Sequence, residues 1–497
     1  MKYFLSFDVG TTSMKCLLFD EHFNEVFFDE REYTLETPQE DMVELDANIY
    51  YDVLCECIKK LAKTGIDTKS IKTITFTTQG ETLIPIDKNG KPLRKAIVWI
   101  DQRAEKEAEF IKSQLSDDEI YRTTGLGEIN GAVPMAKLMW IHKNEREIYD
   151  KTYKFMLLED YLIYKLTKKA VTEQSIISST AWFDIINEKY YQKMLDICGI
   201  DINKLPDISD CGKIVDKVDL KAALETGLSI DTFVVTGAMD QVSSAIGAGN
   251  INEGIVTETT GTALVVGVTA DKPDFDNESR ITIYKHFNHK YLYMPYCNTA
   301  GIVLKWFRDC FMVYLKNEAK EKRVSVYSLI DELAESSKAG SNGIVVLPHF
   351  AGKADNQNAK GVIYGLTLGT KLCDISRGVL EAIGCMLYEL LHIIEKTGVE
   401  ISEIRSLGGG ATSDIWCSIK AGITQKTILR TTYVQTTALG AAILGSVAIG
   451  EYSSVDEALK TVDVKYKEFK PIKEDISSYK KLYEKYSELY EVLDKIF

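Results

Sequence analysis

Two apolar stretches separated by an aspartate and a glycine turn open the chain, in the run FLSFDVGTTSMKCLLFD (4–20). The apolar residues predict two adjacent strands, at 3–7 and 14–19, and Gly10 supplies the turn between them. Both strands are too apolar for a solvent-facing hairpin, so we expect them inside a sheet. A P-loop or a Rossmann glycine motif would lead into a helix, whereas a strand follows here. The pattern therefore predicts a buried hairpin with a polar tip.

A second stretch of the same kind, IVTETTGTALVVGV (255–268), repeats the order of strand, acid, threonines around a glycine, and strand. The two hairpins lie in opposite halves of a 497-residue chain, which is long enough for two large or three smaller domains. They suggest a duplicated architecture with one phosphate-binding loop per half, with chance similarity as the alternative. We place the boundary at the glycine- and alanine-rich helix expected before 254. The predicted domains are 1–248 and 249–497.

The segments around the hairpins alternate between strand and helix patterns. Residues 46–64 have apolar residues at helical spacing, with Asp46 as a plausible N-cap, and 71–87 reads as strand again. In 403–423 a strand ends in three glycines and opens a helix, which would point backbone amides at a ligand. Strands alternating with helices predict an α/β fold. The glycine cluster and the two hairpins together favour a nucleotide as the ligand.

Charge and cysteine usage limit the partners. The formal net charge of −14 argues against an extended surface for nucleic acid or anionic membrane. Ten cysteines without a C-x-x-C pair read as reduced, mostly buried thiols. The start lacks a secretory pattern, and the apolar run at 438–450 is too short for a membrane span. We expect a soluble cytoplasmic protein without nucleic-acid or membrane partners; a homodimer stays open.

Eight motifs in the same order make the chain resemble the FGGY carbohydrate kinases over nearly its whole length. They are DVGTTSMKCLLFD (8–20), VWIDQRA (98–104), PMAKLMWIHKN (134–144), TGAMDQ (236–241), TTGTAL (259–264), GVIYGLTLGTKLCDISRGVLEAI (361–383), GGGATSD (408–414) and TTALGAA (436–442). Gly378 departs from the alanine or serine that is usual there. The resemblance implies an α/β fold of two actin-like, ribonuclease-H-like ATPase domains flanking a central cleft.

The resemblance also implies a binding site for ATP and Mg²⁺. Asp8 would hold the metal ion through water. A surface-turn aspartate is the alternative, and the apolar flanks of Asp8 argue against it. The backbone amides and hydroxyls of the first hairpin would bind phosphate oxygens. The residues expected to bind the nucleotide are Asp8, Gly10, Thr11, Thr12, Lys15, Thr260, Gly261, Thr262, Gly301, Lys305, Gly409, Gly410, Ala411 and Asp414.

Asp240 matches the catalytic aspartate of the family, which would accept the proton of the substrate hydroxyl. A helix N-cap is an alternative role that is compatible with the first. Trp99, Asp101 and Arg103 alternate along an expected strand or its end and would share one face, although Arg103 could instead brace the pocket wall. The residues expected to bind substrate are Gln79, Glu81, Trp99, Asp101, Arg103 and Gln241.

Two departures bear on the identity of the substrate, which we expect to be a small sugar or polyol. Gly80 and Ala132 replace an arginine and a tyrosine of glycerol kinases, which predicts a roomier pocket. The methionine–histidine pair of xylulokinases is also missing. We expect ATP-dependent phosphorylation of a ketose such as xylulose, with a kinase of a small polyol such as glycerol or erythritol as the alternative. A non-catalytic sugar-responsive regulator and an ATP-dependent filament are the alternatives from other classes.

Overall fold

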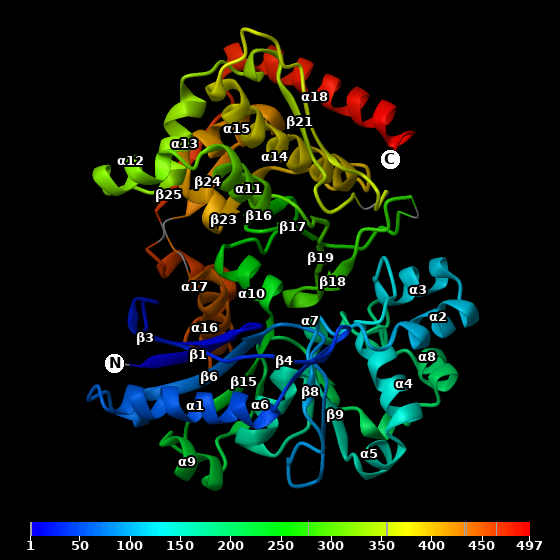
Figure 1. The fold of residues 1–497 in the computed structure, drawn as a ribbon. Helices are drawn as coiled ribbons and strands as arrows, with labels where there is room; N and C mark the ends of the chain where they lie inside the picture. Colours follow the sequence, from blue (N-terminus) through cyan, green and yellow to red (C-terminus); the bar gives the residue numbers. More distant parts are fainter. Residues whose placement is uncertain (1, 277, 354–355, 432, 434, 464) are drawn as a thin grey trace. The chain divides into compact units, whose positions relative to one another are not determined.

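The computed structural model describes residues 2–276, 278–353, 356–431, 433, 435–463 and 465–497 (Figure 1). These form two compact α/β units, which confirms the predicted fold class. Unit 1 comprises Met1–Ile251, Asp271–Leu292 and Gln435–Asp463, and unit 2 comprises Asn252–Ala270, Tyr293–Val434 and Val464–Phe497. The two units therefore do not correspond to a single division of the chain at 248/249. Two segments of the second half, Asp271–Leu292 and Gln435–Asp463, pack with unit 1.

A six-stranded sheet forms the centre of unit 1, in the order β14-β15-β6-β1-β2-β3. Its strands are β1 (Tyr3–Val9), β2 (Ser13–Phe19), β3 (Glu25–Glu32), β6 (Ile71–Thr78), β14 (Ile214–Lys217) and β15 (Phe233–Met239). Strand β1 pairs with β2 antiparallel, as the predicted hairpin requires, while β1, β6 and β15 are parallel. Parallel strands end at the same edge of a sheet. Gly10, Gln79 and Asp240 therefore follow three neighbouring strand ends.

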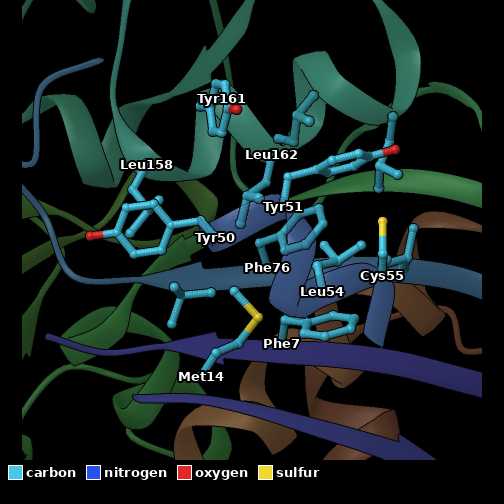
Figure 2. Packing of buried hydrophobic residues seen from close by; sticks show 14 of the residues in the cluster. Phe7, Met14, Tyr50, Tyr51, Leu54, Cys55, Phe76, Leu158, Tyr161 and Leu162 are labelled. Carbon is cyan, nitrogen blue, oxygen red and sulfur yellow. The ribbon is translucent and has the colours of Figure 1, made fainter. Parts of the chain in front are cut away.

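Helices cover both faces of this sheet (Figure 1). On one face lies a core shared by β1, β6, α1 (Ala47–Ala62) and α6 (Leu158–Thr167). Figure 2 shows Leu158, Tyr161 and Leu162 of α6 above Phe76 and Phe7 of the strands. Helix α1 begins where predicted, because the Asp46 side chain accepts a hydrogen bond from the amide of Asn48.

The opposite face carries α10 (Asp240–Gly247) and α16 (Thr436–Ala448). Small residues allow very close contact here. A Cβ atom on Gly445 would lie 2.5 Å from Thr75 Oγ1, and one on Gly440 would lie 2.0 Å from the carbonyl oxygen of Ser243. This close packing explains why residues 435–463, although late in the chain, belong to unit 1.

Most strands of unit 2 belong to an eight-stranded sheet, in which β18 (Ile283–Lys285), β19 (Tyr291–Tyr293), β17, β16, β23, β24 and β25 follow one another and β20 pairs with β17. The second predicted hairpin is present, since β16 (Ile255–Thr260) pairs antiparallel with β17 (Leu264–Ala270). Strand β16 is also parallel to β23 (Glu403–Leu407), which is parallel to β24 (Ile428–Thr431). The other strands here are β20 (Tyr296–Cys297), β21 (Val345–Pro348), β22 (Gly361–Tyr364) and β25 (Tyr466–Phe469).

The helices of unit 2 pack beside this sheet. They are α11 (Gly301–Phe311), α12 (Leu315–Lys322), α13 (Val326–Glu335), α14 (Leu372–Glu395), α15 (Asp414–Thr424) and α18 (Lys473–Asp494), with 3₁₀ turns η4 (Ser341–Gly343) and η5 (Gly409–Thr412). Tyr479, Tyr486 and Tyr490 of α18 are buried. Among the described helices, none combines the length and the apolar character needed to cross a bilayer.

The remaining elements belong to unit 1 or, for β19, lie at its margin. They are β4 (Glu36–Gln39), β5 (Met42–Leu45), η1 (Thr68–Ser70), β7 (Ile84–Ile86), β8 (Ala96–Ile97), α2 (Glu105–Gln114), α3 (Asp117–Thr124), α4 (Pro134–Asn144), α5 (Arg146–Lys151), β9 (Lys154–Met156), β10 (Val171–Glu173), α7 (Gln174–Ile177), β11 (Phe183–Asp184), β12 (Lys189–Tyr190), α8 (Gln192–Cys198), η2 (Ile202–Lys204), β13 (Asp207–Ser209), α9 (Leu220–Thr226), β18 (Ile283–Lys285), η3 (Phe287–His289), β19 (Tyr291–Tyr293) and α17 (Val455–Thr461).

Candidate active site

The first hairpin turn lies between β1 and β2 and is held by a tyrosine. The amide of Gly10 donates to the carbonyl of Ser13 at 2.9 Å, and the hydroxyl of Tyr33 contacts both of these residues' carbonyl oxygens. The Tyr33 amide donates to the carbonyl of Thr12 at 2.9 Å. Thr12 is exposed and Thr11 half-buried. The hydrogen bonds of Tyr33 thus hold the turn in place, while the tip of the turn stays accessible to solvent.

Asp8 lies at the end of β1, directly opposite Lys15 on β2. The Lys15 ammonium is 3.8 Å from the nearer carboxylate oxygen of Asp8. Burial raises the pKa of Asp8, although the charge of Lys15 opposes this shift. The two residues form a loose ion pair beside the turn.

Asp240 is the first residue of α10, immediately after the buried strand β15. The amide of Gln241 donates to Asp240 Oδ1 at 2.6 Å. Burial, and secondarily the charge of Asp8, raises the pKa of Asp240 to about 7. A carboxylate that titrates near neutral pH is suited to accept a proton in a reaction.

The loop after β6 brings Gln79, Gly80 and Glu81 to the same sheet edge. The amide of Gln79 donates to the carbonyl of Val9 at 3.1 Å, and its buried side-chain amide has no hydrogen-bond partner within the described part of the chain. Glu81 adopts a left-handed backbone conformation with φ of 67°. Such a conformation in a residue other than glycine is uncommon and clusters at functional sites.

The expectation of open space at Gly80 is wrong. A Cβ atom on Gly80 would lie 3.1 Å from Ser179 Oγ and 3.4 Å from Met239 Sδ. Ala132 is itself buried. Neighbouring side chains therefore lie where a larger side chain at position 80 would begin. The glycine that replaces the arginine of glycerol kinases leaves no void at this point.

Lys137 of α4 is a buried cation in this region that the sequence did not single out as a site residue. Its ammonium donates to the carbonyls of Val98 and Trp99, both at 3.0 Å, and lies 3.5 Å from the carbonyl of Glu81. Burial lowers the pKa of Lys137 and raises that of the Glu81 carboxyl, and the opposite charges of the two groups counteract both shifts. Lys137 thus ties together the two segments that carry Glu81 and Trp99.

The predicted alternation of Trp99, Asp101 and Arg103 on one strand face is wrong. Strand β8 ends at Ile97, and the chain then turns, so the three side chains have different surroundings. Trp99 is 39% exposed, whereas Asp101 is fully buried. The indole nitrogen of Trp99 donates to Thr11 Oγ1 at 2.9 Å, which links this segment to the first hairpin.

Asp101 and Arg103 are paired with each other inside the protein. Arg103 Nη2 lies 2.7 Å from Asp101 Oδ2 and 2.8 Å from a carboxylate oxygen of Glu44. The amide of Val43 donates to Asp101 Oδ2 at 2.6 Å, and the Arg103 guanidinium lies over the ring of Trp140. These contacts support a bracing role for both residues.

In unit 2, two glycine positions allow the second hairpin and its neighbours to approach closely. The amide of Gly301 donates to the carbonyl of Gly261 at 2.9 Å, and a Cβ atom on Gly301 would lie 2.2 Å from that oxygen. A Cβ atom on Gly410 would lie 2.6 Å from Thr260 Cβ. The hairpin tip, the start of α11 and the glycine loop before α15 therefore meet, as expected for one nucleotide site.

The other nucleotide residues expected in unit 2 differ in accessibility. Gly261, Thr262, Lys305 and Gly409 are exposed, and Ala411 is buried. Asp414, however, is engaged by Arg430 Nη1 at 2.7 Å and by the Lys467 ammonium.

The Thr260 hydroxyl is also hydrogen-bonded within the protein. It donates to Glu258 Oε2 at 2.8 Å and accepts from the Lys420 ammonium at 2.9 Å. Its hydroxyl hydrogen therefore points into the unit rather than toward a ligand. The sequence placed Glu258 in the hairpin pattern, but nothing in it connected that acid to Lys420.

Family models match both parts of the chain. The N-terminal domain of the FGGY family of carbohydrate kinases matches residues 3–247, and its C-terminal domain matches 257–449. The chain belongs to the FGGY family. It is an ATP-dependent kinase of a sugar or polyol, a phosphotransferase with an alcohol group as acceptor.

Relatives of this FGGY kinase carry different names. The gluconokinase of Bacillus subtilis (strain 168) is 28% identical, with 97% of this chain and 94% of the relative covered. The xylulose kinase of Staphylococcus xylosus is also 28% identical, with 99% and 100% covered. The crystal structure of ligand-bound xylulose kinase from Lactobacillus acidophilus superimposes with a TM-score of 0.89 at 26% identity, covering 99% of each chain. The glycerol kinase of Lactobacillus acidophilus (strain ATCC 700396 / NCK56 / N2 / NCFM) is 30% identical, with 97% of this chain and 96% of the relative covered. Similarity alone thus leaves the substrate open between xylulose, gluconate and glycerol.

Proposed function

We propose that this kinase phosphorylates a hydroxyl of a neutral ketose such as xylulose. The charge of the candidate site in unit 1 supports this substrate class. Asp8, Glu81 and Asp240 influence one another's ionisation, since the charge of Asp8 raises the pKa of Asp240 and the charge of Asp240 raises that of Glu81. The site thus holds three interacting acids.

The cations of the same region are committed to other partners. Lys137 donates to backbone carbonyls and its charge offsets that of Glu81, and Arg103 is paired with Asp101 and Glu44. Lys15 lies next to Asp8 at the hairpin, where we place the phosphates. An aldonate would add a carboxylate to an acidic pocket without a free cation to pair with it, which costs free energy in a partly buried site. A neutral sugar avoids this cost.

Asp240 would act as the general base. Phosphoryl transfer depends on positioning, on electrostatic stabilisation and on a group that accepts the proton of the attacking hydroxyl. Asp240 follows a rigid buried strand, and its pKa of about 7 gives it a useful basicity near neutral pH. Gln79, Glu81, Trp99 and Gln241 would contact the sugar, while Asp101 and Arg103 would support the wall beneath it.

ATP would bind through the two hairpins and the glycine loop at 408–411. The exposed tips at Thr12 and at Gly261–Thr262 supply backbone amides and hydroxyls for phosphate oxygens. Asp8 fits a Mg²⁺ ligand, because it is a carboxylate whose charge is balanced only by a loose ion pair with Lys15. When bound, the ion would offset phosphate charge. Unit 1 would thus carry the sugar and unit 2 most of the nucleotide.

A substrate panel tests this proposal through the release of ADP in a coupled assay. We expect the highest kcat/KM with a ketose such as xylulose and the lowest with gluconate, with glycerol and erythritol as the small polyols. Preference for gluconate would contradict the charge argument. Preference for glycerol or erythritol would instead make the enzyme a small-polyol kinase.

The variant Glu81→Gln sharpens the panel, since it removes one of the three carboxyl groups and keeps the shape of the side chain. We expect the ratio of kcat/KM for xylulose to that for gluconate to fall by about tenfold, as a pairwise repulsion of about 1.4 kcal/mol would give. Glu44→Gln, which also removes a carboxylate but one paired with Arg103 and Arg94, is the control and should leave the ratio unchanged. An unchanged ratio in Glu81→Gln would show that charge does not select the substrate.

A further inference from the structure

A fully buried ion pair lies beneath the second hairpin of unit 2. The Lys420 ammonium of α15 is 2.6 Å from Glu258 Oε1 of β16, and both side chains have no exposed surface. The hydroxyl of Ser406, on the adjacent strand β23, also donates to Glu258 Oε1. The pair therefore joins a helix and two strands at the point where the hairpin begins.

Thr260 is the third member of this cluster. Glu258 Oε2 accepts its hydroxyl hydrogen at 2.8 Å, and Lys420 donates to the same hydroxyl oxygen at 2.9 Å. With both contacts made, only one orientation of the hydroxyl satisfies all three side chains. The ion pair thus sets the rotamer of Thr260.

The Thr260 side chain in turn contacts the loops to which we assign the nucleotide. A Cβ atom on Gly410 would lie 2.6 Å from Thr260 Cβ, so the glycine loop packs directly against it. The next residue, Gly261, lies in the turn of the hairpin and accepts the hydrogen bond from the amide of Gly301. A different rotamer at Thr260 would shift the glycine loop, the hairpin tip or both.

We propose that Lys420 and Glu258 are positioning residues for nucleotide binding, acting through Thr260 on the hairpin tip and the glycine loop. The inference rests on the assignment of these loops to ATP in the proposed function. A pair that served only to fill the core would be replaceable by apolar side chains of similar volume, often without loss of stability. Replacing a positioning pair in the same way could also preserve stability, but it would weaken nucleotide binding, because the apolar substitutes release the Thr260 hydroxyl.

This difference defines the test, in which ADP binding is measured by calorimetry and stability by urea unfolding. Lys420→Met leaves Glu258 buried without its cation, so it should lose both stability and ADP affinity. Lys420→Met combined with Glu258→Met removes both charges. We expect this double variant to regain stability, yet its Kd for ADP should remain about tenfold above that of the unchanged protein.

The matched control is a second buried ion pair of unit 2, Arg377 and Glu381 of α14, whose side chains are 7% and 1% exposed. Its partners are Ser341, Tyr479 and backbone groups of 334–340, none of which belongs to the nucleotide loops. Arg377→Met with Glu381→Met should change stability and leave the Kd for ADP as it was. Thr260→Val, which removes only the hydroxyl, should weaken ADP binding as the Lys420/Glu258 double variant does.

Two results would overturn the inference. The first is a Lys420/Glu258 double variant, or a Thr260→Val variant, that binds ADP as tightly as the unchanged protein. The second is an equal loss of affinity in the Arg377/Glu381 control, which would make the effect a general consequence of destabilising unit 2. Failure of the unchanged protein to bind ADP would be a separate outcome, since it would refute the nucleotide site itself.

Discussion

Asp240 holds its proton more tightly than a surface aspartate, because burial and the charge of Asp8 both oppose its ionisation. A general base has to be deprotonated before it can act. The same environment that makes Asp240 basic enough to take a proton therefore limits activity on the acidic side. Glu81 is part of this balance, since the charge of Asp240 raises its pKa in turn.

The first prediction concerns the pH dependence of kcat/KM. We expect activity to fall as the pH drops below about 7, because protonated Asp240 cannot accept the substrate proton. The pH at which activity falls reflects the coupled titration of Asp240 and the neighbouring acids together. Glu81→Gln removes a like charge and should therefore shift this fall in activity to lower pH. Steady-state rates from pH 5 to 9 measure both profiles. A fall in activity near pH 4, the range of an ordinary carboxyl group, would contradict the environment described for Asp240.

For single residues, the sequence predicts which side chains belong to the candidate site better than it predicts their contacts. Asp240 and the two hairpins stand out because an acid or a polar turn interrupts an apolar run. Asp101 and Arg103 stand out too, but their ion pair forms only because the chain turns after β8, so strand periodicity misleads. Lys420 and Glu258 are 162 positions apart, and no local pattern connects them.

Helix α10 carries Asp240, and its position on the sheet depends on the close contact with α16. Gly247 and Gly440 face each other across this contact, since a Cβ atom on Gly247 would lie 1.9 Å from the carbonyl oxygen of Thr436. Neither helix could approach as closely with a larger residue at these positions. The small residues of α16 therefore help to define where the base lies.

Gly440→Ala tests this contact. The added Cβ atom would lie 2.0 Å from the carbonyl oxygen of Ser243, so the helices must separate. We expect a loss of about 3 kcal/mol in the free energy of unfolding, the upper part of the range for overpacked cores. Ala448→Gly, at the half-buried C-terminal end of the same helix, should cost less than about 1 kcal/mol, the difference in helix propensity for a helix interior. Equal losses in urea unfolding would mean that the contact is not close.

A second element-scale feature is a group of buried acids beneath β15. Glu159 and Asp160 of α6 and Glu173 of β10 are each about 1% exposed, and Glu159 accepts a hydrogen bond from the amide of Gly237 in β15. Burial raises the pKa of Asp160 to about 7, and the charge of Glu173 adds to the shift. Burial thus raises the pKa of all three carboxyl groups.

This raised pKa makes stability depend on pH with a definite sign. The folded protein binds the Asp160 proton more tightly than the unfolded chain, so this contribution to stability is present at low pH and is lost as the pH rises through about 7. We expect the unfolding free energy to fall between pH 5.5 and pH 8, and Asp160→Asn to reduce that fall. A fall of the same size in Asp160→Asn, measured by urea unfolding at several pH values, would show that Asp160 is ionised throughout.

Elements with a strong local signal were predictable from sequence. Helix α1 follows from its apolar spacing and from Asp46, and the strand–glycine–helix order at 403–423 appears as β23, η5 and α15. The place of α16 was not predictable, because its sequence is apolar on all sides and indicates only that it is buried. Helix α16 packs closely against Thr75 and Ser243, and this contact determines its position. The periodicity of the sequence does not reveal such a contact.

At the scale of the whole molecule, the recurrence of one hairpin in two halves predicted the two units. Both hairpins exist, in separate sheets, with parallel strands beside them. The family models and the relatives agree that the chain is an FGGY kinase. These relatives are named for different substrates, so activity is the property that separates the proposed substrate from the alternatives.

The variant Asp240→Asn tests the central claim most directly, namely that this carboxylate draws the proton from a bound sugar. It preserves size and the first turn of α10 but removes the base. With a ketose and ATP we expect kcat to fall by about 10²- to 10⁴-fold, while ADP affinity stays unchanged and stability does not fall. Asp46→Asn, at the N-cap of α1, is the control and should retain full activity. An Asp240→Asn enzyme that kept more than about a hundredth of the original kcat would contradict the account.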